Sequence, residues 1–279
     1  NDAPVVVGPG LAYTVNEQAN LSIEGTGFSV SDADASSGTM TATITVGEGW
    51  ITVVSGNSGA TISSGNGTGT VVLTGTLSEI DSLLTGAGTG TISYNNGSDS
   101  PSSSTTITVI VNDGGNTGAD PGLTGDGWSE EGYASQTINI TALNDDPTNG
   151  GSLASDVTIL EDVATDLDLS LVDILDVDAA ASSMTVTLSV SSGVLDAVTG
   201  SGVTITGSGS NVVTLDGTIG DLNNYLNTTT NIQYTGALNV NGDDADVLTF
   251  TVNDNGNTGA GGGTPINFGT MNIDLTAVN

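Results

Sequence analysis

Lysine, arginine, histidine and cysteine are all absent from this sequence of 279 residues, which has 32 aspartates and glutamates and a formal net charge of −32. The chain therefore lacks the residues of Ser-His and Cys-His nucleophiles, of Schiff bases, and of thiolate or imidazole metal sites. Without basic residues, direct binding to nucleic acid or to an anionic membrane is unfavourable. Disulfides are excluded too, so spacing, solvent or bound metal must relieve the repulsion among carboxylates.

Aromatic residues are also scarce, at 4% of the chain, while glycine is abundant with 41 residues. Any core must therefore be filled mainly by valine, isoleucine and leucine. The sequence contains no apolar run of about 18 residues, the length that a membrane-spanning helix requires. We expect an anionic protein of the extracellular space or cell surface, with any targeting signal outside this segment.

The most informative pattern is internal repetition, because several segments recur at an offset of about 135 to 144 residues. Residues 1–4 return as 144–147, residues 75–84 as 217–226, and residues 111–118 as 252–259. Residues 141–144 return as 276–279, so the chain begins and ends at the same phase of the repeat. We predict two tandem domains, 1–143 and 144–279, with a linker at about 142–148, as in an excerpt from a longer array.

Within each repeat, β-branched residues alternate with small polar ones, which is typical of half-buried strands. The clearest examples are residues 39–46, 105–111, 184–190 and 247–252. Turns rich in glycine, asparagine and aspartate separate them, so the predicted fold is an all-β, antiparallel Greek-key sandwich. Residues 77–84 and 219–226 are the exception, because apolar residues spaced by three and four predict one short helix in each repeat. Trp50 lies in an alternating stretch and is predicted to be part of the core.

The acidic residues fall in loops at the ends of this predicted sandwich. In a Greek-key sandwich the loop after the second strand and the loop after the sixth lie where the chain enters the domain. In the first repeat this end should therefore gather Asp2, Asp32, Asp34, Asn112 and Asp113. Glu17, in the turn after the first strand, should lie at the opposite end.

The same reasoning predicts a metal site at the junction of the repeats, formed by Glu17, Asn144, Asp145, Asp146, Asp176, Asp178, Asn253 and Asp254. Two carboxylates about 4 Å apart repel by about 4 kcal/mol at an effective dielectric near 20. Six to eight oxygen ligands suit Ca²⁺ better than Mg²⁺. Glu161, with Asp162, would serve the next junction, and the metal ligands of the preceding junction would be Asp2, Asp32, Asp34, Asn112 and Asp113. The alternative is that Asp-Asn-Gly segments are simply turns, but their recurrence in both repeats favours calcium.

These motifs resemble the bacterial cadherin-like tandem repeats of giant secreted adhesins and extracellular matrix proteins. The resemblance rests on Asn-Asp-Ala-Pro at 1–4, Asn-Glu-Gln at 16–18, Ser-Asp-Ala-Asp at 31–34, residues 75–81 and Val-Asn-Asp-Gly-Gly-Asn-Thr-Gly at 111–118. It covers essentially the whole chain and implies Ig-like β-sandwiches whose linkers bind Ca²⁺. The implied role is structural: a calcium-rigidified repeat of an adhesin, matrix fibre or surface filament, with neighbouring repeats as partners and lateral self-assembly as a further possibility.

Two other readings stay open. The 119–133 loop contains Trp128 and Tyr133 and is longer than its counterpart at 260–268, so it could bind a glycan or a protein partner. A glycosidase built from carboxylates alone would need two acids flanking a cleft, and we expect no enzyme because every acid pair has a better explanation at a junction or turn. The acidic run 243–246 is interpreted as a solvated turn rather than a second metal site.

Overall fold

A computed structural model describes residues 2–35, 37–115, 131–179, 181–200 and 202–278 of the chain. The chain divides into two compact units, Asn1–Ala142 (unit 1) and Leu143–Asn279 (unit 2). In the described residues, both units are all-β apart from one short helix each, as the sequence predicts. Within the described part of the chain, no helix has the length and apolar character needed to cross a membrane.

Unit 1 consists of a six-stranded sheet, a three-stranded sheet and a two-stranded ribbon. The six-stranded sheet has the order β2 (Tyr13–Asn16), β11 (Glu131–Thr141), β10 (Ser104–Asn112), β5 (Thr39–Val46), β8 (Thr70–Thr76) and β7 (Thr61–Ser64). The three-stranded sheet has the order β3 (Leu21–Ser22), β9 (Thr91–Asn95) and β6 (Trp50–Val54). The ribbon pairs β1 (Val5–Val7) with β4 (Ser29–Ser31). Among the described strands of this unit, every pairing is antiparallel except that of β2 with β11, which is parallel.

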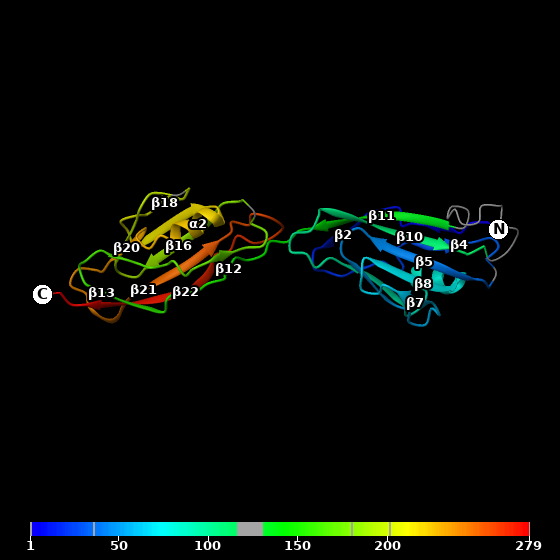
Figure 1. Ribbon diagram of the computed structural model, residues 1–279, viewed down its shortest axis with the longest axis horizontal. Coiled ribbons are helices and arrows are strands. Elements are labelled where there is room, and N and C mark those ends of the chain that lie inside the picture. The colour runs from blue at the N-terminus through cyan, green and yellow to red at the C-terminus, as the bar shows by residue number, and fades with distance from the viewer. Residues whose placement is uncertain (1, 36, 116–130, 180, 201, 279) are drawn as a thin grey trace. The chain divides into compact units, whose positions relative to one another are not determined.

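Unit 2 repeats this topology strand for strand. Its six-stranded sheet has the order β13 (Asp156–Leu160), β22 (Ile266–Thr276), β21 (Gly242–Asn253), β16 (Met184–Val190), β19 (Val212–Gly217) and β18 (Thr204–Thr206). The three-stranded sheet is β14 (Thr165–Asp166), β20 (Ile232–Thr235) and β17 (Val194–Ala197), and the ribbon is β12 (Thr148–Asn149) with β15 (Ile174–Leu175). The equivalence of the two sheet orders confirms the internal repeat that the sequence predicts. Figure 1 labels β12, β13, β16, β18, β20, β21 and β22 of this unit on the ribbon.

The two helices coincide with the segments of helical spacing, α1 at Leu77–Leu84 and α2 at Ile219–Leu226. Each begins after a threonine and has an acidic residue at its third position. The Thr76 backbone N–H donates to the Glu79 carboxylate at 2.7 Å, and the Asp221 N–H donates to the Thr218 hydroxyl at 3.3 Å. Such caps satisfy N–H groups that the first helical turn leaves without partners. Side chains on one face anchor each helix in the core: Ile80, Leu83 and Leu84 in α1, and Leu222, Tyr225 and Leu226 in α2.

The core of each unit lies between its six-stranded and three-stranded sheets, as in a β-sandwich. In unit 1, Ile44 and Val109 from the larger sheet and Ile92 from the smaller are all fully buried in one cluster. The prediction that Trp50 belongs to this core is wrong, because its side chain is 38% exposed. Its neighbour Ile51 is buried instead, so the tryptophan occupies the outward phase of β6.

Candidate metal sites

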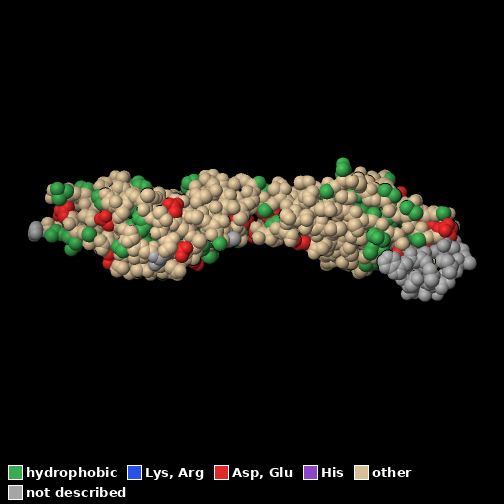
Figure 2. Space-filling model, turned by 90° about the horizontal axis from the view of Figure 1, so that it is seen from above, with side chains coloured by type: hydrophobic (Ala, Val, Ile, Leu, Met, Phe, Trp, Pro, Cys, Tyr) green, Lys and Arg blue, Asp and Glu red, His purple; other side chains and the backbone are tan. Residues whose placement is uncertain are grey.

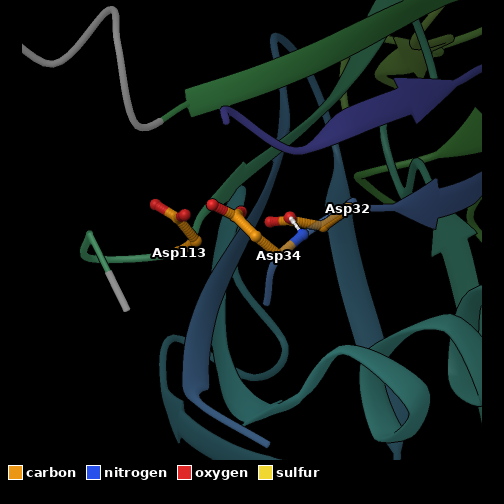
Figure 3. Close-up of side chains that lie close together, drawn as sticks. All are labelled: Asp32, Asp34 and Asp113. Atoms are coloured by element: carbon orange, nitrogen blue, oxygen red, sulfur yellow. Dashed lines mark hydrogen bonds between the residues drawn. The ribbon is translucent and has the colours of Figure 1, made fainter. Parts of the chain in front are cut away.

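Three carboxylates meet at the end of unit 1 where the chain enters. Asp32 and Asp34 come from the loop after β4, and Asp113 comes directly after β10. One carboxylate oxygen from each residue lies within 4.8 Å of those of the other two, and Asp34 lies between Asp32 and Asp113 (Figure 3). Figure 2 shows acidic side chains at this end of unit 1. The two loops thus converge as the sequence predicts.

The local backbone already holds one oxygen of each carboxylate. Asp32 Oδ1 accepts hydrogen bonds from the N–H groups of Asp34, at 2.9 Å, and Ala35, at 3.1 Å. Asp113 Oδ1 accepts from the Gly115 N–H at 3.1 Å, and Asp34 Oδ2 from the Asp2 N–H at 3.2 Å. The bonds of Asp32 and Asp113 are those of ordinary Asx turns, whereas the bond from Asp2 joins the start of the chain to the loop after β4. By themselves they explain how the loops fold, but they do not explain why three acids face one another.

The other oxygens of Asp32 and Asp113 distinguish this cluster from an ordinary pair of turns. Asp32 Oδ2 and Asp113 Oδ2 are buried, and no described residue donates a hydrogen bond to either of them. The whole Asp113 side chain is 0% exposed. The pKa of Asp32 is raised overall, and burial is the largest cause. Asp34 and Asp113 also raise it, while hydrogen bonds from backbone N–H groups partly offset these effects. Buried charges require compensation, and the chain has no lysine, arginine or histidine to supply it. Hard oxygen donors in this arrangement fit Ca²⁺.

Unit 2 brings the corresponding residues together through a chain of hydrogen bonds. Asp178 Oδ2 accepts from the Asp145 N–H at 3.2 Å, and Asp176 Oδ1 accepts from the Asp178 N–H at 3.1 Å. The Asn144 side-chain amide donates to Asp254 Oδ2. Asp178 and Asp254 are buried, at 8% and 1% exposed. All five residues lie within unit 2, so the segment 144–145 is part of that unit's own site.

The unit 2 group also contains polar atoms that the described residues leave without a hydrogen bond. Asn144 Oδ1 and Asp176 Oδ2 are both buried in this way. Burial, followed by the neighbouring Asp178, raises the pKa of Asp176 to about 6. A carboxyl group with so high a pKa sits in a place that disfavours its charged form. A bound cation would reverse that preference, and an amide carbonyl beside carboxylates is a typical calcium ligand set.

Several predicted ligands make contacts that belong to the surrounding loops. Asn112 Oδ1 accepts from the Gly114 N–H, and Asn253 Oδ1 accepts from the Asn255 N–H, both at 2.8 Å. Asp146 and Asp2 are exposed. A metal-binding role for these four residues stays a prediction.

The two predicted glutamates occupy equivalent buried turns, directly after β2 and β13. Glu17 is 3% exposed, and its N–H donates to the Thr141 carbonyl at 3.0 Å. Glu161 is 6% exposed and accepts from Asn241 Nδ2 and the Val278 N–H, both at 2.9 Å. These bonds, that of Val278 first, lower the pKa of Glu161. Burial of a glutamate in a turn is unusual, and it marks both positions as more than solvated loop residues.

The 119–133 loop, predicted as a possible contact site, lies largely outside the described residues. Its last part belongs to β11, where Tyr133 is 64% exposed.

The sequence interpretation missed one buried carboxylate. Asp246 was expected in a solvated turn, yet it lies in β21 and is only 5% exposed. It accepts hydrogen bonds from the Tyr234 hydroxyl at 2.7 Å and from the backbone N–H groups of Ser191, Ser192 and Gly193 at 2.8, 3.1 and 2.9 Å. The signal was its phase, because Asp246 lies on the same inward face of β21 as Leu248 and Phe250. These donors satisfy its carboxylate, so it is a structural anchor rather than a metal ligand.

Comparisons with known proteins give only distant structural likeness. No family model matches the chain, and a search of curated proteins found no match. One similar solved structure is human protocadherin-24 EC1-2, with 12% identity over 99% of this chain and 100% of that chain and a TM-score of 0.37. Another is Drosophila N-cadherin EC1-4, with 13% identity over 100% of this chain and 50% of that chain and a TM-score of 0.33. An endo-fucoidan hydrolase from glycoside hydrolase family 107 is also similar, with 14% identity over 100% of this chain and 29% of that chain and a TM-score of 0.26. The chain thus spans half of the N-cadherin structure and less than a third of the hydrolase. At this level the likeness assigns neither a family nor a function.

Proposed function

We propose that the chain is a calcium-binding structural repeat of a longer extracellular adhesin, matrix fibre or surface filament. The observation that carries the proposal is the convergence of Asp32, Asp34 and Asp113, in which Asp32 Oδ2 and Asp113 Oδ2 are buried with no donor among the described residues, in a chain that has no cationic side chain. Ca²⁺ supplies the missing positive charge. The equivalent group in unit 2 supports the same role, because a turn preference alone gives no reason for two loops to bury acids together twice.

Asp32, Asp34 and Asp113 would hold the ion in unit 1, and Asn144, Asp145, Asp176, Asp178 and Asp254 would hold it in unit 2. Glu17 and Glu161 keep the ligand role that the sequence predicts for them. By removing the repulsion among these acids, calcium stiffens the array and stabilises the folded units. A ligand that binds only the folded state adds about 1.4 kcal/mol of stability for each tenfold excess over its dissociation constant. Extracellular calcium modules bind at about 10⁻⁴ to 10⁻³ M.

Calorimetric titration of the whole chain with CaCl₂, combined with thermal melts, tests the calcium proposal. We expect binding in both units. Asp113→Asn should abolish the heat from unit 1, and Asp254→Asn that from unit 2. Asp243→Asn is the matched control, since it removes one charge from an exposed acidic group in which Asp274 and Asp244 raise the pKa of Asp243. It should leave binding unchanged.

Absence of heat and of a melting shift at about 10 mM CaCl₂, which is above the range of known extracellular modules, would refute the proposal. An equal effect of Asp243→Asn and Asp113→Asn would also refute it, because binding would then reflect only general charge screening. Glu17→Gln tests the predicted role of Glu17 as a calcium ligand, and this variant should bind calcium more weakly without losing binding altogether. Small-angle scattering at each calcium concentration measures the stiffening. An unchanged scattering profile on saturation would reject the rigidified-repeat role while leaving the binding sites intact.

A further inference from the structure

Trp50 lies on the outward face of the three-stranded sheet β3-β9-β6. The side chains that alternate with it on β6, Ile51 and Val53, are 0% and 1% exposed, whereas the tryptophan is 38% exposed. The edge of its indole ring lies against Gly97: a Cβ atom on residue 97 would be only 2.8 Å from the ring atom Cη2. The absence of a side chain at Gly97 therefore makes room for the ring at the surface.

Neutral polar side chains continue this face across the sheet. Trp50 pairs with Asn95 on β9, whose side-chain amide donates to Asn20 Oδ1 at 2.9 Å and to the Gln18 carbonyl at 3.3 Å. Since Tyr94 is fully buried, Asn95 belongs to the outward phase of β9. The next row of paired residues contains hydroxyl groups only. It consists of Thr52, Ser93 and Ser22.

Acidic residues border this face. Glu24 accepts from the Ser22 hydroxyl at 3.1 Å and from the Ile92 N–H at 2.8 Å. Glu48 accepts from Asn96 Nδ2 at 2.8 Å, and Asp99 accepts from the Gln18 amide. An anionic ligand placed on the indole would meet these carboxylates and the net charge of −32, so charge selects against sulfated or uronate ligands.

Unit 2 has the same three-stranded sheet without this surface. The registers place Val194, paired with Thr235, at the position of Trp50 paired with Asn95. The next row in unit 2 contains Asp196, Gln233 and Asp166 in place of three hydroxyl residues. The sandwich of unit 2 thus forms with valine at this position. The exposed aromatic ring and the neutral polar rows are particular to unit 1, and the fold does not require them.

We propose that this face of unit 1 binds a neutral saccharide, with a pyranose ring stacked on the indole of Trp50. A pyranose ring has an apolar face of C–H groups, which matches the partly exposed indole, and a rim of hydroxyl groups, which matches the amides and hydroxyls of the adjacent rows. A lone aromatic ring among hydrogen-bonding side chains suits a sugar better than a second copy of the chain, which would bring another 32 negative charges. This inference does not depend on calcium binding.

The indole N–H resonances of the ¹⁵N-labelled chain test the proposal, because the sequence has only two tryptophans, Trp50 and Trp128. Trp50→Val and Trp128→Phe assign the two signals. The probes are neutral tetrasaccharides of β-glucan, α-glucan, mannan, galactan and chitin, and the matched anionic probe is the C6-oxidised β-glucan tetramer. We expect a saturable shift of the Trp50 signal with at least one neutral probe. Oxidation should weaken binding of the glucan, if that is the ligand, by at least about tenfold, and an uronate that binds as tightly as its neutral parent would contradict the charge argument.

Trp50→Val copies the residue that unit 2 has at this position, so it should fold normally, with an unchanged melting midpoint, and lose binding by on the order of tenfold or more. Val194→Ala is the control in unit 2 and should bind as the parent does. The proposal is overturned if no neutral probe shifts the Trp50 signal, if Trp50→Val binds equally well, or if the shift belongs to Trp128. Sedimentation without sugar tests the alternative that a second copy of the chain occupies this face. Self-association that Trp50→Val abolishes would assign the face to contact between copies and overturn the proposal.

Discussion

Replacement of Asp246 by alanine should strongly destabilise unit 2. Its carboxylate accepts hydrogen bonds from Tyr234 Oη and from the backbone of Ser191, Ser192 and Gly193, and it thereby ties the loop after β16 to strands β20 and β21. Because alanine offers no acceptor, the variant leaves these donors without their partner. The burial of the site determines how much this costs.

Two of the donors, Tyr234 Oη at 2.7 Å and the Gly193 N–H at 2.9 Å, make buried bonds. A hydrogen bond to a charged group contributes about 1.5–3 kcal/mol, so loss of these two predicts a destabilisation of about 3–6 kcal/mol. The N–H groups of Ser191 and Ser192 lie in exposed residues and can bond to water instead. Since a domain is typically stable by about 5–15 kcal/mol, Asp246→Ala should bring unit 2 close to unfolding at ambient temperature.

Urea unfolding followed by two probes measures this effect in one chain. Both tryptophans fall within the sequence of unit 1, so tryptophan fluorescence follows unit 1 and circular dichroism follows both units. The dichroism transition should split, with the fluorescence transition unchanged. Thr105 is the counterpart of Asp246 in unit 1. Its hydroxyl accepts a single hydrogen bond from described residues, from the Glu48 N–H at 2.9 Å. Thr105→Ala should therefore lower the free energy of unfolding of unit 1, measured by fluorescence, by only about 1 kcal/mol. A cost below about 1 kcal/mol for Asp246→Ala would refute the reasoning, because the carboxylate would then contribute no more than a neutral hydroxyl.

Three further outcomes follow from the structure. Without calcium, the raised pKa of Asp176, about 6, makes its charged form destabilising. Unit 2 should therefore lose stability as the pH rises through 6. Chemical denaturation of the Asp176→Asn variant should show no such loss. Lowering the pH through the same range should weaken calcium binding in unit 2, because the proton competes with the ion; titrations at about pH 5 and 7.5 that give equal affinities would contradict this. Glu79→Ala removes the acceptor for the Thr76 N–H at the start of α1 and should lower the midpoint of the fluorescence-detected transition, whereas Ser78→Ala, at an exposed position, should leave the midpoint nearly unchanged.

Much of the fold could be predicted because the sequence contains its own comparison. The spacing of Leu77, Ile80, Leu83 and Leu84 recurs at 219–226, and both segments are helices with the predicted bounds. Likewise, loop positions relative to alternating strands were enough to bring Asp32 and Asp34 to Asp113, although these residues are some 80 positions apart. Topology places loops at one end of a sandwich irrespective of their separation in sequence.

The errors arose where residue type and strand phase disagree. Hydrophobicity suggested that Trp50 is buried, but its phase is that of Thr52, and the inward set is Ile51 with Val53. Charge suggested that Asp246 is solvated, but its phase is that of Leu248. Side-chain partners decide such cases, because Tyr234 and three N–H groups can satisfy a buried carboxylate, and a sequence does not reveal which distant groups will face a given position.

The parallel pairing of the first long strand with the last determines how each unit responds to tension. In unit 1, β2 and β11 are hydrogen-bonded in register from Tyr13 and Ile138 to Asn16 and Thr141, and in unit 2 β13 and β22 pair over five residues. Once β1 has been drawn away from β4, a pull on both ends of unit 1 draws β2 and β11 along their length in opposite directions. The hydrogen bonds between them are then loaded together in shear, instead of being opened one after another. A unit connected in this way should therefore resist stretching more than one whose terminal strands peel apart one hydrogen bond at a time.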